Sequence, residues 1–373
     1  MTWGHAFAAH RAAIASFSKT KGRRMDGNAA PLAEIAEAHR FDVARLDDHL
    51  RRTIDDFGSG LEIRQFQGGA SNPTFLLTTD GGAKRYVMRK KPPGQLLASA
   101  HQVDREYRVM KALAGSDVPV PVMRTLCEDP EVIGTAFYVM DYLEGRIFRD
   151  AALPGLAATE RAAIYDELNA TLAKLHQVDF EAVGLGNYGR PGGYFERQLA
   201  RWTRQYRDAE TERIPAMETL IEELAGRIPA DQSVSIAHGD YRLENVMFHP
   251  TEPRLIAVLD WELSTIGHPL ADLSYNAFLW HSLGASWGTL AGVDFATSGI
   301  PTEADYVAAY CRRTGRSEIE DWNFYLGFSV FRLASISQGV YRRVLAGNAA
   351  SQREAVNGAP QLAEQALALL RRA

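Results

Sequence analysis

The sequence HGDYRLEN occupies residues 238–245, and the tripeptide DWE follows at residues 260–262. Between them the apolar run LIAVL, residues 255–259, predicts a short buried strand. An aspartate, an asparagine five residues later, a strand and a second aspartate is the order of groups that phosphoryl transfer uses. A single Asp or Asn in a loop more often serves a turn or a cap. The ordered combination makes chance the less favoured explanation.

Three side chains of this pattern have distinct chemical roles in such a reaction. We expect Asp240 to accept or orient the proton of an attacking hydroxyl group. We expect Asn245 and Asp260 to bind Mg²⁺, because this ion takes few protein ligands and completes its shell with phosphate oxygens and water. The pattern therefore predicts an enzyme that transfers a phosphoryl group from ATP with Mg²⁺.

These motifs resemble those of the aminoglycoside phosphotransferase/choline kinase-like family. Residues 86–94 (YVMRKKPPG) and 103–110 (VDREYRVM) resemble more closely the kinase-like domain of some acyl-CoA dehydrogenase family members and its free-standing bacterial relatives. The resemblance runs from about residue 61 to near the C-terminus. It implies an α+β, protein-kinase-like bilobal fold and a small-molecule kinase that uses an alcohol group as acceptor.

Hydrophobic periodicity agrees with a strand-rich lobe followed by a helical one. We divide the chain into a basic N-terminal extension (1–25), a nucleotide-binding N-lobe (26–145) and a C-lobe with the catalytic loop, metal and substrate site (146–373). In the N-lobe we expect helices at 41–53 and 101–113, strands at 61–66, 74–79, 86–89 and 136–143, and a turn at 80–82. In the C-lobe we expect helices at 158–177, 194–209, 215–227, 269–279, 302–314, 319–345 and 352–371, and strands at 234–237, 246–249 and 255–259.

Two N-lobe segments are candidates for nucleotide binding. A glycine-rich hairpin brings backbone N–H groups onto phosphate oxygens; this predicts a role for Gly68, Gly69, Ser71 and Asn72, although an ordinary tight hairpin is nearly as good an explanation. The segment from Met140 to Gly145 matches the family's hinge, whose backbone bonds adenine, with Met140 and Tyr142 as the expected contacts. A plain strand end with a turn is an equal alternative.

The third strand is expected to supply a cation to the α- and β-phosphates. Motif position favours Arg89 where kinases have Lys, although strand alternation puts Arg89 and Lys90 on opposite faces without saying which face meets the nucleotide. Glu106 is its expected partner; a surface helix charge is the alternative. Arginine retains the positive charge but offers a planar fork, which leaves the choice between ATP and GTP open.

Other C-lobe residues support the proposed centre. Arg242 is a candidate catalytic residue that either stabilises the transferred phosphate or pairs with Glu244. We interpret His238 as structural, and the segment from His268 to Asp272 as the family's brace for the catalytic loop. Glu262 either orients a metal-bound water or caps the next segment.

The sequence says least about the molecule that accepts the phosphoryl group. Residues 273–293 have no charged side chain and are interpreted as a buried helix ending near residue 283, then a loop lining a pocket, not as a membrane span. Their rings suit a choline-like cation or an acyl chain, although core packing is the commoner role. The resemblance favours a hydroxyacyl-CoA or a similar metabolite. Arg332, Arg342 and Arg343 would meet CoA phosphates or lie on solvated helix faces.

Composition fits a cytoplasmic enzyme. The chain has 373 residues and a formal net charge of -5, which argues against a nucleic-acid partner. Two distant cysteines indicate reduced thiols, and residues 1–25 lack the apolar segment of a secretory signal. The expected partners are a nucleotide and a small hydroxylated molecule, without a membrane; the oligomeric state is unreadable.

Two rival functions use the same fold. A catalytically silent, nucleotide-binding regulatory module is disfavoured because Asp240, Asn245 and Asp260 are all present. A protein kinase is disfavoured because no A-P-E-like segment follows Asp260. An aminoglycoside or choline-type kinase remains an alternative on the acceptor side.

Overall fold

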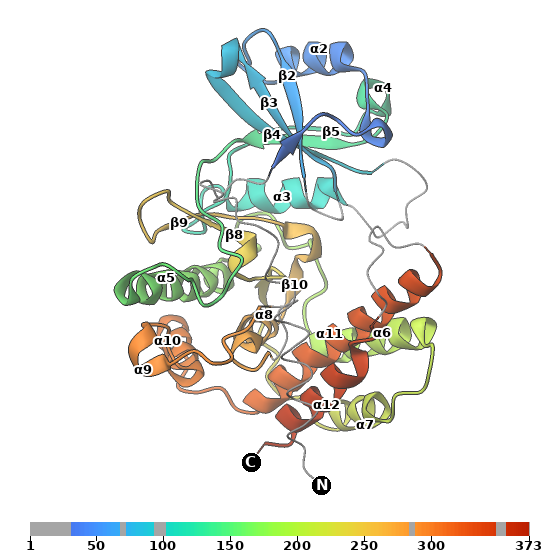
Figure 1. Cartoon of the computed structure of the whole chain (residues 1–373), viewed down its shortest axis with the longest axis vertical. Coiled ribbons are helices and arrows are strands. Elements are labelled where there is room, and N and C mark those ends of the chain that lie inside the picture. Colours follow the sequence, from blue (N-terminus) through green and yellow to red (C-terminus); the bar gives the residue numbers. More distant parts are fainter. Residues whose placement is uncertain (1–30, 68–71, 93–101, 283–287, 348–355, 373) are drawn as a thin grey trace, which may run out of the picture.

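The computed structural model describes residues 31–67, 72–92, 102–282, 288–347 and 356–372. Strands gather in the N-terminal lobe and helices fill the C-terminal lobe (Figure 1). This is the expected α+β, protein-kinase-like bilobal fold. The N-terminal extension and residues Gly68, Gly69 and Ser71 lie outside the described ranges.

The described part of the N-lobe contains an antiparallel sheet with the strand order β1-β2-β3-β4-β6-β5. The strands are β1 (Leu32–Ala33), β2 (Glu62–Phe66), β3 (Thr74–Thr79), β4 (Lys84–Lys90), β5 (Met123–Cys127) and β6 (Phe137–Asp141). The short 3-10 turn η3 (Asp80–Gly82) joins β3 to β4, where a turn was expected.

Strand β4 divides its side chains between two environments. Met88 packs in an apolar cluster with residues of α2 (Val43–Thr53), and Lys90 lies over the ring of Phe41 on the same side. Burial lowers the pKa of the Lys90 ammonium group. Arg89 lies on the opposite face, toward the C-lobe. The structure thus places Arg89, not Lys90, beside the DWE segment, residues 260–262.

The C-lobe is built around one large apolar core. Its helices in the described ranges are α5 (Ala158–Gln177), α6 (Tyr194–Ala209), α7 (Pro215–Ala225), α8 (Pro269–Ala277), α9 (Phe295–Ser298), α10 (Glu303–Thr314), α11 (Trp322–Leu345) and α12 (Ala359–Leu370). Helix α3 (Val103–Leu113), below the N-lobe sheet in Figure 1, contributes Val109, Met110 and Leu113 to this core and so joins the lobes. The short helix α4 (Pro130–Ile133) packs against α2.

Two small antiparallel pairs frame the catalytic segment. Strand β7 (Ser235–Ala237) pairs with β10 (Thr265–Gly267), and β8 (Val246–Phe248) pairs with β9 (Leu255–Val258). The loop from His238 to Asn245 therefore leaves one pair and enters the other. The 3-10 turns η4 (Leu243–Asn245) and η5 (Trp261–Leu263) carry the ends of the two motifs.

The predicted helices are confirmed, with some shifted ends. Helices α5 and α6 have both predicted ends, whereas the helix expected at 352–371 begins at Ala359. The helix expected at 269–279 stops at Ala277 and continues as a 3-10 turn, η6 (Phe278–Trp280). Strands β1, β5 and β10 were not predicted; they are short, and pairing with β2, β6 and β7 defines them as strands. No helix of the described ranges is long and apolar enough to span a membrane.

Candidate active site

A buried carboxylate holds the backbone of the catalytic loop. Asp272, in the first turn of α8, accepts the N–H groups of His238 at 2.5 Å and Gly239 at 2.8 Å. Gly239 has φ of +84°, and a Cβ atom there would lie 2.6 Å from the carbonyl oxygen of Leu263. Only glycine fits this turn without strain. The bracing contact expected of Asp272 is therefore present.

His238 links the loop to the segment that carries Asp260. Its Nδ1 accepts the N–H of Asp240 at 3.2 Å, so its Nε2 carries the proton and donates to the carbonyl oxygen of Leu259 at 2.8 Å. The ring packs against Trp261 with centroids 4.7 Å apart. These contacts are structural, as the sequence interpretation had it. His268 acts elsewhere: it caps α8 by accepting the N–H of Leu270.

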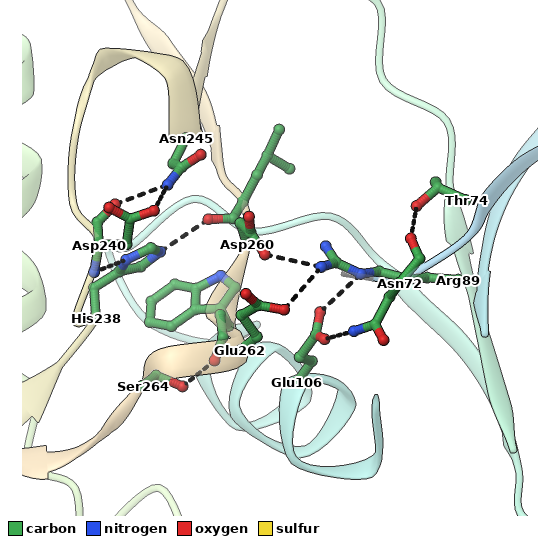
Figure 2. A network of polar contacts seen from close by, with 12 residues as sticks. Asn72, Thr74, Arg89, Glu106, His238, Asp240, Asn245, Asp260, Glu262 and Ser264 are labelled. Atoms are coloured by element: carbon green, nitrogen blue, oxygen red, sulfur yellow. Dashed lines mark hydrogen bonds and ion pairs between the residues drawn. The ribbon is translucent and has the colours of Figure 1, made fainter. Parts of the chain in front are cut away.

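The carboxylate of Asp240 is held from two sides. Nδ2 of Asn245 donates to its Oδ2 at 2.7 Å, and the hydroxyl group of Tyr275 donates to its Oδ1 at 2.5 Å. Nδ2 of Asn245 also donates to the backbone carbonyl of Asp240 at 2.8 Å. Both hydrogens of the Asn245 amide are thus committed to Asp240, which leaves its amide oxygen as the atom for a cation (Figure 2).

Strand register brings the two candidate metal ligands together. Val246 pairs with Val258, and the N–H of Leu259 donates to the carbonyl of Asn245 at 2.8 Å. Asp260, the next residue, has φ of +61°, a left-handed conformation that an aspartate tolerates better than most residues. The loop and the DWE segment therefore meet at the residues that the sequence pattern singled out (Figure 2).

Arg89 joins the N-lobe to this segment. Its Nη2 lies 2.9 Å from Oδ1 of Asp260 and 3.6 Å from Oε2 of Glu262, and its Nε lies 3.4 Å from Oε2 of Glu106. Burial alone would lower the pKa of Arg89, but Glu106 and Asp260 hold it above its ordinary value. One guanidinium faces three carboxyl groups, and this surplus of acidic groups suits a divalent cation.

Glu106 is fully buried and anchored by two side chains. Oε1 accepts Nδ2 of Asn72 at 2.9 Å, and Oε2 accepts the hydroxyl of Tyr138 at 3.0 Å. Burial raises the pKa of Glu106 to about 7, against the opposing effect of Arg89. Asn72, which was predicted to contact the nucleotide phosphates, thus holds the side chain of Glu106 in this structure. Tyr138 was missed, because only strand pairing places it opposite Arg89.

The donor set suits Mg²⁺. No group of three or more His, Cys, Asp or Glu residues in the described part of the chain could hold a metal ion. Magnesium needs fewer protein ligands, and hard oxygen donors from one carboxylate and one amide match its preference. The Asp260 side chain is 36 % exposed, so one of its oxygens can reach an ion from solvent.

The remaining predicted site residues have other contacts. Arg242 forms an ion pair with Glu244, one of its two expected roles. Met140 pairs with Val87 in β4 and with Met123 in β5, while the N–H of Tyr142 donates to the carbonyl of Arg85. Adenine contact by this segment stays a prediction.

The aromatic residues after Asp272 are mainly core. Trp280 packs against Tyr165 and Tyr306 and donates to a backbone carbonyl, so it does not line an acceptor pocket. Tyr275 and Phe278 instead border a small cavity beside the catalytic loop. Its lining is Arg242, Tyr275, Asn276, Phe278, Leu279 and Leu333. The cavity has a volume of about 10 Å³ and therefore holds at most one water. No carboxylate is among its lining residues.

Three arginines were candidates for binding CoA phosphates. Arg342 and Arg343 are exposed on α11, as solvated helix residues are. Arg332 is only 9 % exposed and donates to the carbonyl of Gly239 at 2.6 Å. It is therefore part of the support of the catalytic loop, a role that sequence spacing does not reveal.

Comparison with known proteins identifies the family of this chain. The model of the phosphotransferase enzyme family matches residues 62–323. The chain belongs to this phosphotransferase family. A crystal structure from Ralstonia eutropha JMP134, assigned to the aminoglycoside phosphotransferases, is 49% identical with a TM-score of 0.82, covering 89% of this chain and 99% of the other. A choline kinase from Cryptosporidium parvum shares the fold, with a TM-score of 0.58 at 12% identity, over 88% of this chain and 95% of the other.

Curated relatives of this phosphotransferase are longer proteins. Acyl-CoA dehydrogenase family member 11 of Homo sapiens is 45% identical over 349 residues, which is 91% of this chain and 44% of the relative. Acyl-CoA dehydrogenase family member 10 of Mus musculus is 46% identical over 310 residues, 82% of this chain and 29% of the relative. The chain thus spans less than half the length of either relative, as the sequence resemblance implied a kinase-like domain would.

Proposed function

We propose that this phosphotransferase moves the γ-phosphoryl group of ATP, with Mg²⁺, onto the hydroxyl group of a small molecule. The observation that carries the proposal is the carboxylate of Asp240, fixed between Asn245 and Tyr275. A carboxylate held in one orientation is suited to accept the proton of a hydroxyl group that attacks the γ-phosphate in line.

The charged groups support a division of labour in this reaction. Asn245 and Asp260 would hold Mg²⁺, which neutralises charge on the β- and γ-phosphates when bound. Arg89 would bind the α- and β-phosphates while remaining tied to Glu106. The glycine-rich segment with Gly68, Gly69 and Ser71 would cover the phosphates, and Met140 with Tyr142 would border the adenine.

We further propose a hydroxyacyl-CoA or similar acyl metabolite as the acceptor. Two curated relatives are named acyl-CoA dehydrogenase family members. The wall beside Tyr275 is apolar, with Phe278, Leu279 and Leu333, and Arg242 is its charged residue. A polycationic aminoglycoside would favour carboxylates there, and this lining has none. The cavity is too small for an acyl chain, so the acyl proposal rests on the names of the two relatives.

The test is ADP release from ATP and Mg²⁺ in the presence of separate acceptor pools. The pools are hydroxyacyl-CoAs, amino alcohols, sugars and aminoglycosides, and Asp240→Ala is the control protein. Release that depends on the hydroxyacyl-CoA pool and on Asp240 is expected. Release with aminoglycosides alone would overturn the acceptor proposal, and equal release by Asp240→Ala would overturn the proposed base.

A further inference from the structure

Tyr275 is the donor to Asp240 that the sequence pattern did not include. Its hydroxyl reaches Oδ1 of Asp240, and Asn245 reaches Oδ2, so a different protein donor holds each oxygen. We propose that Tyr275 is a positioning residue that orients the catalytic carboxylate, and that Arg332 holds Tyr275 in place. This inference rests on the proposed function of Asp240.

Helix α8 contacts both the backbone next to Asp240 and the side chain of Asp240. Asp272 and Tyr275 are three residues apart on this helix and project from the same side. Asp272 fixes the backbone at Gly239, and Tyr275 fixes the side chain of Asp240. Since one rigid element makes both contacts, the carboxylate plane and the loop backbone keep a constant relation.

Tyr275 is suited to act as a permanent hydrogen-bond donor. Its side chain is 8 % exposed. Burial, and then the charge of Asp240, raises the pKa of the Tyr275 hydroxyl well above its ordinary value. The hydroxyl therefore stays protonated across the working range of pH and does not compete with Asp240 for the proton of the acceptor.

The guanidinium of Arg332 lies over the ring of Tyr275. Its guanidinium carbon lies 5.3 Å from the centroid of the Tyr275 ring and 5.5 Å from that of Trp202. Arg332 is nearly buried, its Nε has no hydrogen-bond partner, and it forms no ion pair with a carboxylate in the described part of the chain. A buried guanidinium without a carboxylate is costly. Its contacts with two rings and the carbonyl of Gly239 give it a defined place beside the loop.

Loss of the Tyr275 hydroxyl should affect the Asp240 carboxylate and the nucleotide-binding residues differently. Without Tyr275, Oδ1 of Asp240 loses its donor and the carboxylate can rotate. Asn245 stays anchored, because it also bonds the backbone carbonyl of Asp240. Arg89 hydrogen-bonds to Asp260, whereas the hydroxyl of Tyr275 donates to Asp240. Phosphoryl transfer should therefore suffer while nucleotide binding is preserved.

The experiment compares Tyr275→Phe with Tyr165→Phe. Tyr165 is a matched control, since it is also buried and its hydroxyl donates to the backbone carbonyl of Ala151, away from Asp240. With the hydroxyacyl-CoA pool as probe, Tyr275→Phe is expected to lower kcat on the order of 10- to 100-fold. The KM for MgATP should change less than about twofold, and more ADP should form per phosphorylated product.

A double-variant cycle tests the role of Arg332. Arg332→Gln should lower kcat in the same direction as Tyr275→Phe, and the double variant should lose much less than the product of the two single losses, because both act through Asp240. Independent, multiplicative losses would show that Arg332 does not hold Tyr275.

Crystal structures of the wild type and Tyr275→Phe give a readout that does not depend on turnover. The expected result is a rotated Asp240 carboxylate with a lengthened bond from Asn245. An unchanged carboxylate, or a wild-type kcat in Tyr275→Phe, would overturn the inference. Asp240→Ala distinguishes failure of the proposed function from failure of this inference. If Asp240→Ala keeps full turnover, the proposed function is wrong. If Asp240→Ala is inactive while Tyr275→Phe is fully active, only the positioning role of Tyr275 is wrong.

Discussion

Nη2 of Arg89 lies 2.9 Å from Oδ1 of Asp260, which joins a strand of the N-lobe to the DWE segment of the C-lobe. The same guanidinium lies 3.4 Å from Glu106 on α3. A planar fork can hold two carboxylates at once, whereas an ammonium group is a point charge. Arginine at this position therefore matches the wide spacing of its partners.

Arg89→Lys is expected to weaken the enzyme without abolishing it. Lysine keeps the charge but cannot bridge Glu106 and Asp260 in the same way, so kcat/KM for MgATP should fall roughly 10-fold. Steady-state kinetics with varied MgATP measures this change. The exposed arginine substitution Arg343→Lys on α11 is the control. Unchanged kcat/KM in Arg89→Lys would show that only the charge matters.

Asp260→Ala and Asp240→Ala should separate nucleotide binding from chemistry. Removing the Asp260 carboxylate deletes a proposed Mg²⁺ ligand, so the Kd for MgATP should rise at least about 10-fold. Asp240→Ala should keep the Kd within a few-fold of wild type and lose transfer. Isothermal titration with and without Mg²⁺ measures both. Equal weakening by the two variants would contradict the division of roles.

Asp272→Asn should destabilise the C-lobe and the loop together. The amide that replaces one oxygen would face the N–H of His238 or Gly239, so a buried donor would lose its acceptor. We expect a loss of about 3 kcal/mol in the free energy of unfolding in urea. Asp294→Asn, at the exposed cap of α9, is the control and should cost less than about 1 kcal/mol. Similar losses in both variants would argue against the brace.

The sequence predicted the parts of the site that depend on local spacing. Asp240, Asn245 and Asp260 meet because a short hairpin follows the loop, and the intervals between them already imply that hairpin. Arg89 and Lys90 could not be separated, since alternation names two faces but not the lobe that each face meets. The role of Tyr275 depends on how α8 packs against the loop 35 residues earlier. Arg332, 93 residues from Gly239, depends on helix packing alone.

His268 makes stability depend on pH below neutrality. Burial lowers its pKa to about 4, although Asp231 opposes this shift. The unfolded chain binds the proton near the ordinary histidine value of about 6.5. Folded protein thus binds fewer protons, and the contribution is full above about pH 6.5 and is lost as the pH falls toward 4.

The pH prediction is checked by urea unfolding at pH 7 and pH 5. From its two pKa values His268 should contribute a loss of about 2 kcal/mol between pH 7 and pH 5. This loss is read as the difference between wild type and variant, because Glu106, with its pKa raised to about 7, acts in the opposite direction over the same interval. His268→Asn retains a side chain that can cap α8, so it should fold but show a smaller loss over this interval. An equal loss in wild type and variant would assign the pH dependence to other groups. Asp231 is not such a group, because its pKa, lowered to about 2, places its own effect at more acidic pH.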